Sequence, residues 1–127
     1  MSSSHFQPQD IARIEKPWGY ELIFGRTAKY VGKVLHINAG QSLSLQYHEV
    51  KDETLYLISG RISLLLRSDD EECLVTMQVG ESYHIPPLLI HQIEALEDSD
   101  VIEVSTPELH DVIRLQDRYG RQGTSAP

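Results

Sequence analysis

The sequence predicts an all-β domain of the sandwich or barrel kind. Short runs rich in β-branched and aromatic residues recur along the chain, each bounded by turn residues, and almost no segment has a helical period. A length of 127 residues allows one domain and leaves no room for two independent cores. Hydrophobic residues make up 40% and charged residues 24% of the chain, which excludes a wholly disordered protein and a coiled coil.

The expected strands follow one another at short intervals. Residues 18–24 and 30–37 are rich in aromatic and β-branched residues, and the turn residues 38–40 end the second run. Residues 42–47 alternate polar and apolar side chains. The later strands are expected at residues 54–58, 61–66, 73–79, 82–85, 91–96 and 101–105, separated by Ser59-Gly60, the acidic loop 68–72, Gly80 and Pro86-Pro87.

The two ends of the chain are expected to be flexible segments around one barrel domain. Residues 1–10 are Ser-rich and polar, and residues 120–127 are small and polar. The domain is therefore expected at residues 11–119. Its last part, residues 109–119, fits either a final strand or a short terminal helix.

The charge balance argues against nucleic acid as a partner. The chain carries 19 acidic and 11 basic residues, a net charge of -8, and no basic stripe. This charge also repels anionic membranes, and a phosphorylated substrate would need a local basic pocket. No apolar run approaches the roughly 20 residues that span a bilayer. Residues 1–10 do not resemble a secretory signal, and the lone Cys73 cannot form an internal disulfide. These features predict a cytoplasmic protein.

Four polar residues on three runs of the chain are candidates for a divalent-metal site. Gln46 and His48 are two apart in an expected strand, so both side chains leave the same face, which also carries two serines. A polar inner face is unusual in a small barrel, whose interior is normally apolar. Glu53 begins the next strand across a turn, and His91 opens a strand after two rigid prolines. If they converge at one end of a barrel, these four side chains suit a metal that keeps positions open for substrate.

The spacing of these residues resembles the two conserved motifs of the cupin superfamily. Residues 40–60, which contain Gln46, His48 and Glu53, are similar to the first motif, and residues 80–91 are similar to the second. The chain departs from the motifs in having Gln46 for His, Leu88 for Gly and Ala95 for Asn. The resemblance implies a single-domain cupin, which is a double-stranded β-helix or jelly-roll-like barrel.

A closer resemblance covers almost the whole chain. Residues 15–20, 42–48 and 113–121 are similar to the C-terminal cupin domain of type II phosphomannose isomerases, which are often fused to a mannose-1-phosphate guanylyltransferase. The resemblance implies a homodimer that interconverts mannose 6-phosphate and fructose 6-phosphate through an enediol. It also implies a divalent metal, with zinc expected first and manganese, iron or nickel as alternatives. The implied ligands are Gln46, His48, Glu53 and His91.

An isomerase of this kind needs a base near the metal and a basic site for phosphate. The candidates for the general base are Lys51, His84 and His36. The candidates for binding the substrate phosphate are Lys33, Arg114 and Arg118.

Two other classes of function stay open. His48, Glu53 and His91 match the two-histidine, one-carboxylate ligand set of non-haem iron dioxygenases, with Gln46 as a fourth ligand or a bystander. The other class is a non-catalytic binding module for a sugar or sugar nucleotide. In each case the expected partner is a small molecule, and neither nucleic acid nor a membrane is expected.

Overall fold

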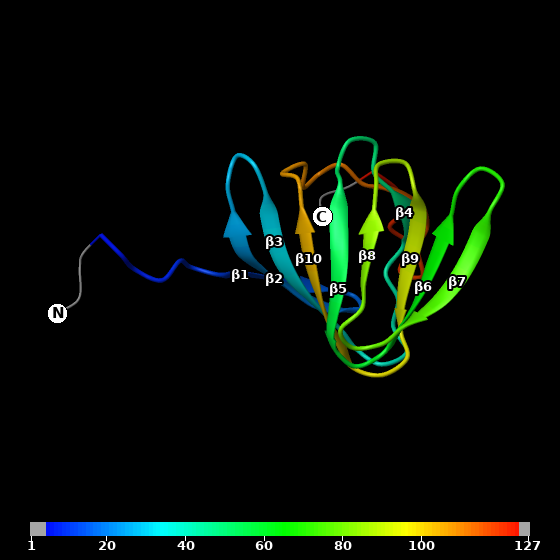
Figure 1. The fold of residues 1–127 in the computed structure, drawn as a ribbon, viewed down its shortest axis with the longest axis horizontal. Helices are drawn as coiled ribbons and strands as arrows, with labels where there is room; N and C mark the ends of the chain where they lie inside the picture. Colours follow the sequence, from blue (N-terminus) through cyan, green and yellow to red (C-terminus); the bar gives the residue numbers. More distant parts are fainter. Residues whose placement is uncertain (1–4, 125–127) are drawn as a thin grey trace.

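Two antiparallel sheets of six strands each make up the fold, which confirms the all-β prediction (Figure 1). The structure is a computed structural model that describes residues 5–124. Its strands are β1 (Ala12–Lys16), β2 (Gly19–Arg26), β3 (Val31–Ile37), β4 (Leu45–Tyr47), β5 (Glu53–Ser59), β6 (Ile62–Arg67), β7 (Glu72–Met77), β8 (Ser82–Ile85), β9 (Ile90–Ala95), β10 (Ser99–Ser105), β11 (Ile113–Gln116) and β12 (Gly123–Thr124).

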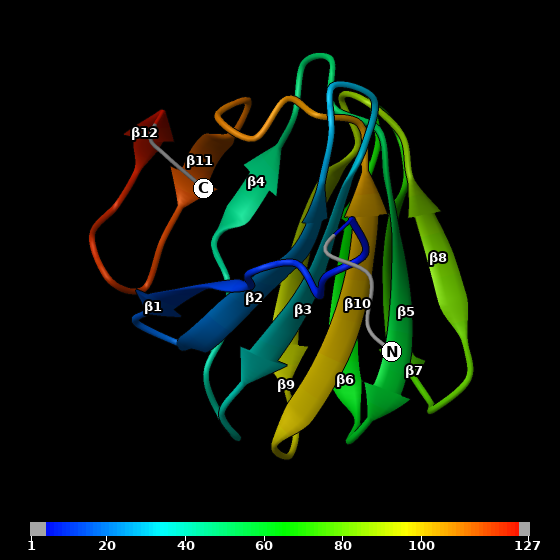
Figure 2. The same cartoon turned by 90° about the vertical axis from the view of Figure 1, so that its left-hand side faces the viewer.

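The two sheets lie against each other and form the walls of one barrel (Figures 1 and 2). The first sheet has the strand order β1-β2-β3-β10-β5-β8, and the second has the order β12-β11-β4-β9-β6-β7. Strands distant in sequence therefore become neighbours. In the second sheet Gln46 on β4 pairs directly with His91 on β9, so the two expected halves of the metal site meet.

The core explains why the strands keep their register. On β5 the side chains of Glu53, Leu55 and Leu57 are buried, whereas those of Tyr56 and Ile58 are exposed. Burying a leucine contributes about 1.5–3 kcal/mol, and a shift of one residue would turn every buried side chain outward. The other fully or almost fully buried members of the main core are Trp18, Leu35, Ile37, Ile62, Leu64, Met77, Ile85, Ile93, Ala95 and Val101.

The strand boundaries differ from the expected ones mainly at the ends of the chain. Residues 12–16 form β1, which pairs with β2. The ambiguous residues 109–119 contain the strand β11, so the first of the two expected alternatives is confirmed. Within the expected flexible ends, residues 1–4 and 125–127 lie outside the described residues, whereas Gly123 and Thr124 pair with β11. Over residues 5–124, no helix is long and apolar enough to cross a membrane.

The expected strand at residues 42–47 is shorter than predicted. Only residues 45–47 belong to β4, and Ser42 makes an isolated bridge to Glu94. The amide of Leu43 still donates to the carbonyl of Ile93 over 2.9 Å, so this segment runs along β9 before β4 begins. This contact keeps the approach to Gln46 and His48 fixed against the strand that carries His91.

Candidate metal centre

Three side chains converge inside the barrel at the ends of three strands. His48 follows β4, Glu53 begins β5 and His91 lies on β9. The Oε1 atom of Glu53 lies 3.1 Å from Nε2 of His48 and 3.2 Å from Nε2 of His91. All three side chains are buried, and their ligand atoms lie within 4.8 Å of one another. The structure thus brings together three of the four residues expected as ligands.

Hydrogen bonds fix which nitrogen of each imidazole faces the cluster. Nδ1 of His48 lies 2.6 Å from the carbonyl oxygen of Asp111, and Nδ1 of His91 lies 2.9 Å from that of Leu89. A carbonyl oxygen only accepts hydrogen bonds, so each Nδ1 carries the proton and donates it. In the neutral rings both Nε2 lone pairs then point at a carboxylate oxygen. Three acceptors aimed at one another need a cation or added protons between them, and this donor set fits a divalent metal.

The carboxyl group of Glu53 is held in its ionised form. Burial by itself would raise its pKa, but the nearby Lys51 ammonium opposes this effect, and the pKa lies well below its usual value. Its second oxygen, Oε2, lies 3.4 Å from Nζ of Lys51 and accepts no hydrogen bond from the described residues. A buried negative charge is therefore available to a cation at the cluster.

Lys51 joins the cluster to a second buried carboxyl group. Its Nζ lies 3.0 Å from Oε2 of Glu103 and 3.4 Å from Oε2 of Glu53. Burial lowers the pKa of Lys51, but the two carboxylates outweigh burial and raise it above its ordinary value, so the side chain is an ammonium at neutral pH. Burial and the charge of Glu53 raise the pKa of Glu103.

Gln46 lies beside the three-residue cluster and not within it. Its side chain lines the pocket next to His48. Nε2 of Gln46 donates to the hydroxyl oxygen of Ser44 over 3.1 Å. That bond orients the amide and leaves Oε1 as its remaining acceptor.

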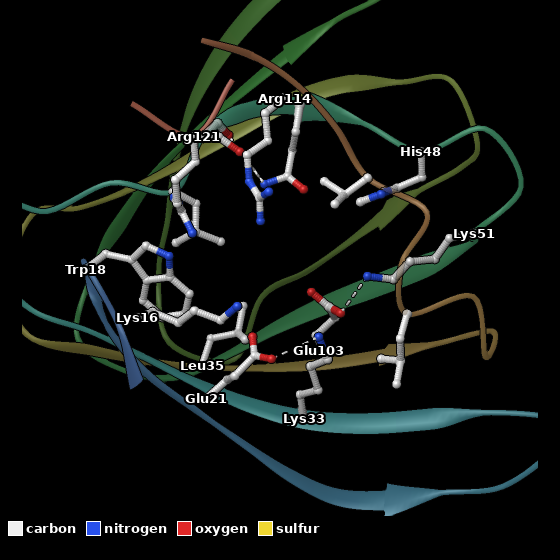
Figure 3. Close-up of a pocket in the computed structure, with 15 residues that line it drawn as sticks. Lys16, Trp18, Glu21, Lys33, Leu35, His48, Lys51, Glu103, Arg114 and Arg121 are labelled. Carbon is white, nitrogen blue, oxygen red and sulfur yellow. Dashed lines mark hydrogen bonds and ion pairs between the residues drawn. The ribbon is translucent and has the colours of Figure 1, made fainter. Parts of the chain in front are cut away.

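A hollow that His48 helps to line runs along the inner face of the barrel (Figure 3). Its cavity volume is about 50 Å³, and the empty space rises to about 450 Å³ when the open solvent at its mouth is included. Its apolar wall contains Trp18, Leu35, Leu43, Leu109 and Val112. Its charged wall contains the cations Lys16, Lys33, Lys51, Arg114 and Arg121 and the carboxylates of Glu21 and Glu103. A chain of net charge -8 thus collects basic side chains in one hollow, which is the local basic pocket that a phosphorylated substrate requires.

Several basic side chains of this wall lie close enough together to lower one another's pKa. Burial lowers the pKa of Lys16, and the cations of Lys33, Arg121 and Arg114 lower it further against the opposing effect of Glu21. Burial and Arg121 likewise lower the pKa of Arg114. An anion that entered here would be stabilised by this excess of positive charge.

Two cations of the wall, Lys33 and Arg121, form close ion pairs with carboxylates. Nζ of Lys33 lies 3.4 Å from Oε1 of Glu21, and both side chains are buried. Nε of Arg121 lies 2.9 Å from Oδ2 of Asp117. These pairs hold the long basic side chains in place along the hollow.

Three of the candidate residues lie away from the hollow. His84 pairs across the sheet with Thr54, which is one residue from Glu53, so its side chain leaves the opposite face of the barrel. It is exposed and lies 2.6 Å from Asp52. His36 stacks on Tyr20, and Arg118 is exposed and contacts the carbonyl of Gly40. Lys33, Lys51 and Arg114 do line the hollow.

Sequence reasoning missed four charged residues of the wall. Lys16 and Arg121 lie in the stretches 15–20 and 113–121, yet neither was singled out as a binding residue. Glu21 and Glu103 carried a signal of their own, because each occupies an inward position of a strand. On β10, Glu103 stands between the buried residues Val101 and Ser105. A charged residue at a position of a strand whose neighbours two residues away are buried therefore indicates a polar cavity.

The comparisons with known proteins agree with this geometry. The family described as mannose-6-phosphate isomerase C-terminal matches residues 4–117. The chain belongs to this family. It is 29% identical over 113 residues to mannose-1-phosphate guanylyltransferase of Escherichia coli K12, an alignment that covers 85% of this chain and 23% of that protein. A second curated relative, from Salmonella typhimurium, is 28% identical with the same coverage. The chain thus spans less than a quarter of the length of these relatives.

Solved structures establish the fold of this family member as that of a cupin. KdgF from Halomonas sp. has a TM-score of 0.67 at 23% identity, covering 79% of this chain and 89% of that one. Oxalate decarboxylase from Bacillus subtilis has a TM-score of 0.72 at 18% identity, covering 87% of this chain and 31% of that one. At these identities the likeness concerns the fold, and it confirms the predicted cupin barrel.

Proposed function

We propose that the chain is a metal-dependent sugar-phosphate isomerase of the mannose 6-phosphate and fructose 6-phosphate type. One observation carries the proposal: His48 of the cluster and the cations Lys16 and Arg114 line the same hollow. A sugar phosphate has the complementary parts, because it carries carbonyl and hydroxyl oxygens at one end and a phosphate at the other. The match to the mannose-6-phosphate isomerase C-terminal family supports this substrate class.

In this proposal His48, Glu53 and His91 hold the metal, and Gln46 supplies a further oxygen beside them. Nitrogen and carboxylate ligands at an open site suit zinc, which is our first expectation, while manganese, iron and nickel accept the same donors. When bound, such a metal polarises a carbonyl and stabilises the negative charge that develops on its oxygen.

The side chains of this chain would bind and orient the substrate. Lys16, Arg114 and Arg121 neutralise the phosphate, and Lys33, also in the wall, adds to the positive field. The rings of Trp18 and the side chain of Leu35 offer an apolar surface for the carbon skeleton of the sugar (Figure 3).

We assign proton transfer to the pair of Lys51 and Glu103, whose charged atoms lie 3.0 Å apart beside the cluster. The isomerisation moves a proton between C1 and C2 through an enediol. The Glu103 carboxylate takes the proton from C2 of the aldose and returns it to C1. The Lys51 ammonium gives a proton to the C1 oxygen as the enediol forms and regains one from the C2 hydroxyl as the ketone forms. His84 plays no part in this scheme, because it lies on the outer face.

The proposal is tested by following mannose 6-phosphate with zinc-loaded protein in deuterium oxide by proton NMR. We expect fructose 6-phosphate to form and deuterium to enter at C2 of the remaining substrate. His91→Ala should lose both reactions, while His110→Ala, which changes an exposed histidine outside the hollow, should keep them. Metal-loaded protein that binds the sugar phosphate without any exchange would instead support a non-catalytic binding module.

The ligand set itself favours a second candidate function. Two histidines and one carboxylate are the ligands of non-haem iron dioxygenases. This candidate requires Fe²⁺ and the consumption of dioxygen. Iron-loaded protein would then take up oxygen in the presence of substrate, and full turnover under anaerobic conditions would exclude the dioxygenase.

The proposal also includes a cytoplasmic homodimer, as the sequence predicts. The exposed sheet edges at β7 and β8 end the two sheets, and edges of this kind are commonly covered by a partner. Sedimentation velocity at micromolar concentration should give the mass of two chains, and a mass of one chain would contradict this part of the proposal.

A further inference from the structure

Asp111 makes an unusual set of contacts with the loop that separates two of the proposed metal ligands. Its carboxylate accepts hydrogen bonds from the backbone amides of Glu49 over 3.0 Å, Val50 over 2.7 Å and Lys51 over 2.8 Å. Its own backbone carbonyl accepts the hydrogen bond from Nδ1 of His48 over 2.6 Å. One residue therefore holds both the loop and the imidazole.

These contacts cross from one end of the chain to the other. Asp111 precedes β11, and the bonds to the loop link residues separated by about sixty positions in sequence. His48 and Glu53 stand at the two ends of this loop. The position of the loop determines where both ligand atoms lie, so a residue that fixes the loop also fixes the spacing of the cluster.

The bond to His48 has a chemical consequence as well as a geometric one. Because the Asp111 carbonyl accepts a hydrogen bond from the protonated Nδ1 of His48, the Nε2 lone pair of the neutral ring faces Oε1 of Glu53. Hydrogen bonds of this kind from the second nitrogen of a ligating histidine set its tautomer and raise its basicity, and their loss typically weakens metal binding 10- to 100-fold.

We propose that Asp111 is the positioning residue of the metal centre: its carboxylate anchors residues 49–51 so that its own carbonyl accepts a hydrogen bond from Nδ1–H of His48 and leaves Nε2 free for the metal. The inference rests on the metal centre of the proposed function. It concerns metal affinity and ligand geometry, and it holds whichever reaction the loaded protein catalyses.

Asp117 provides a matched control within the same part of the chain. Its carboxylate also accepts three hydrogen bonds, from the backbone amide, Nε and Nη2 of Arg121, but it contacts none of the three clustered ligands. Asp111→Asn and Asp117→Asn therefore remove equivalent charges and comparable bonds. Only Asp111→Asn should change the affinity for the metal and the geometry of its ligands.

The test measures zinc affinity by competition with a chromogenic chelator and records the visible absorption spectrum of the cobalt-loaded full chain. Asp111→Asn should bind zinc about 10- to 100-fold more weakly and shift the cobalt bands, while Asp117→Asn should match the wild type in both. Equal affinities and identical spectra for Asp111→Asn and the wild type would overturn the positioning role while leaving the metal centre intact. A wild-type chain that takes up neither zinc nor cobalt would refute the metal centre and this inference together.

A measurement on the wild type covers the case in which Asp111→Asn does not fold. In the zinc-loaded chain, labelled with ¹⁵N at histidine, His48 should carry a proton on Nδ1 and bind metal through Nε2. Coordination of the metal through Nδ1 of His48 would overturn the proposal, because the Asp111 carbonyl could not then accept a hydrogen bond from that atom.

Discussion

Replacing Leu88 by glycine should stabilise the protein, although it removes an apolar side chain. Leu88 has a φ of +74°, and among the described residues it is the one non-glycine residue with a positive φ. A side chain in this conformation costs roughly 1–2 kcal/mol. Glycine avoids that cost but loses about 0.5–1 kcal/mol through greater freedom of the unfolded chain. Because Leu88 is 64% exposed, little burial is lost, and a net gain of about 0.5–1 kcal/mol follows.

The strained turn also contacts residues of the proposed metal centre. The amide of Leu88 donates to the carbonyl of His48 over 2.7 Å, and the next carbonyl, that of Leu89, accepts from Nδ1 of His91 over 2.9 Å. Leu88→Gly keeps both backbone bonds, so zinc affinity should not change. The substitution restores the glycine that the second cupin motif has at this position.

Urea denaturation followed by circular dichroism measures the effect. The midpoint should rise for Leu88→Gly with an unchanged slope. Leu96→Gly is the matched control, because Leu96 is also an exposed leucine in a turn, at 44% exposure, but has no positive φ to relieve. The control should lose stability. A loss of stability for Leu88→Gly equal to that of the control would refute the argument from backbone strain.

Three further predictions concern charge and metal. Asp117→Asn should lower the free energy of unfolding by about 2 kcal/mol at neutral pH, the value of buried hydrogen bonds to a charged group. Burial alone would raise the pKa of Asp117, but the hydrogen bonds from Arg121 lower it. The stability difference from wild type should therefore be complete above pH about 5 and shrink as the pH falls below the ordinary Asp range, which urea titrations at several pH values would measure. Lys51→Ala should lower the free energy of unfolding in urea by about 3–5 kcal/mol, because it leaves the buried carboxylates of Glu53 and Glu103 without their cation. The double variant Lys51→Ala with Glu103→Gln should recover part of this loss. Zinc at a hundredfold excess over its dissociation constant should add about 2.7 kcal/mol, seen as a rise in Tm that a chelator reverses, and a Tm indifferent to zinc would count against the site.

The strand pattern and the metal cluster were the most predictable parts of this molecule. The two-residue period placed Gln46 and His48 on one face, and the short turn before Glu53 limited how far that carboxylate could lie from His48. The family motif supplied the distant partner His91. Each of these inferences depends on local geometry or on a spacing that the cupin fold repeats. The structure brings His48, Glu53 and His91 together and pairs Gln46 with His91 across two strands.

The composition of the pocket was harder to predict, because it depends on contacts between strands distant in sequence. Lys16 and Arg121 reach the hollow from opposite ends of the chain, and no local pattern reports such a meeting. His84 has the residue type of a general base, but its pairing with Thr54 turns it outward. The sequence shows which side chains of one strand share a face. Which face of β8 points into the barrel depends on its register with β5, and the sequence does not show that register.

Elemental analysis by mass spectrometry, on full-length protein purified without a metal-affinity tag, tests the metal centre most directly. Wild type supplied with zinc should retain about one zinc per chain after dialysis, since structural and catalytic sites with histidine and carboxylate ligands bind zinc tightly. His91→Ala should retain almost none, and His110→Ala should match the wild type. A wild-type chain without bound metal, or equal zinc content in His91→Ala, would contradict the assignment of His48, Glu53 and His91 as a metal site.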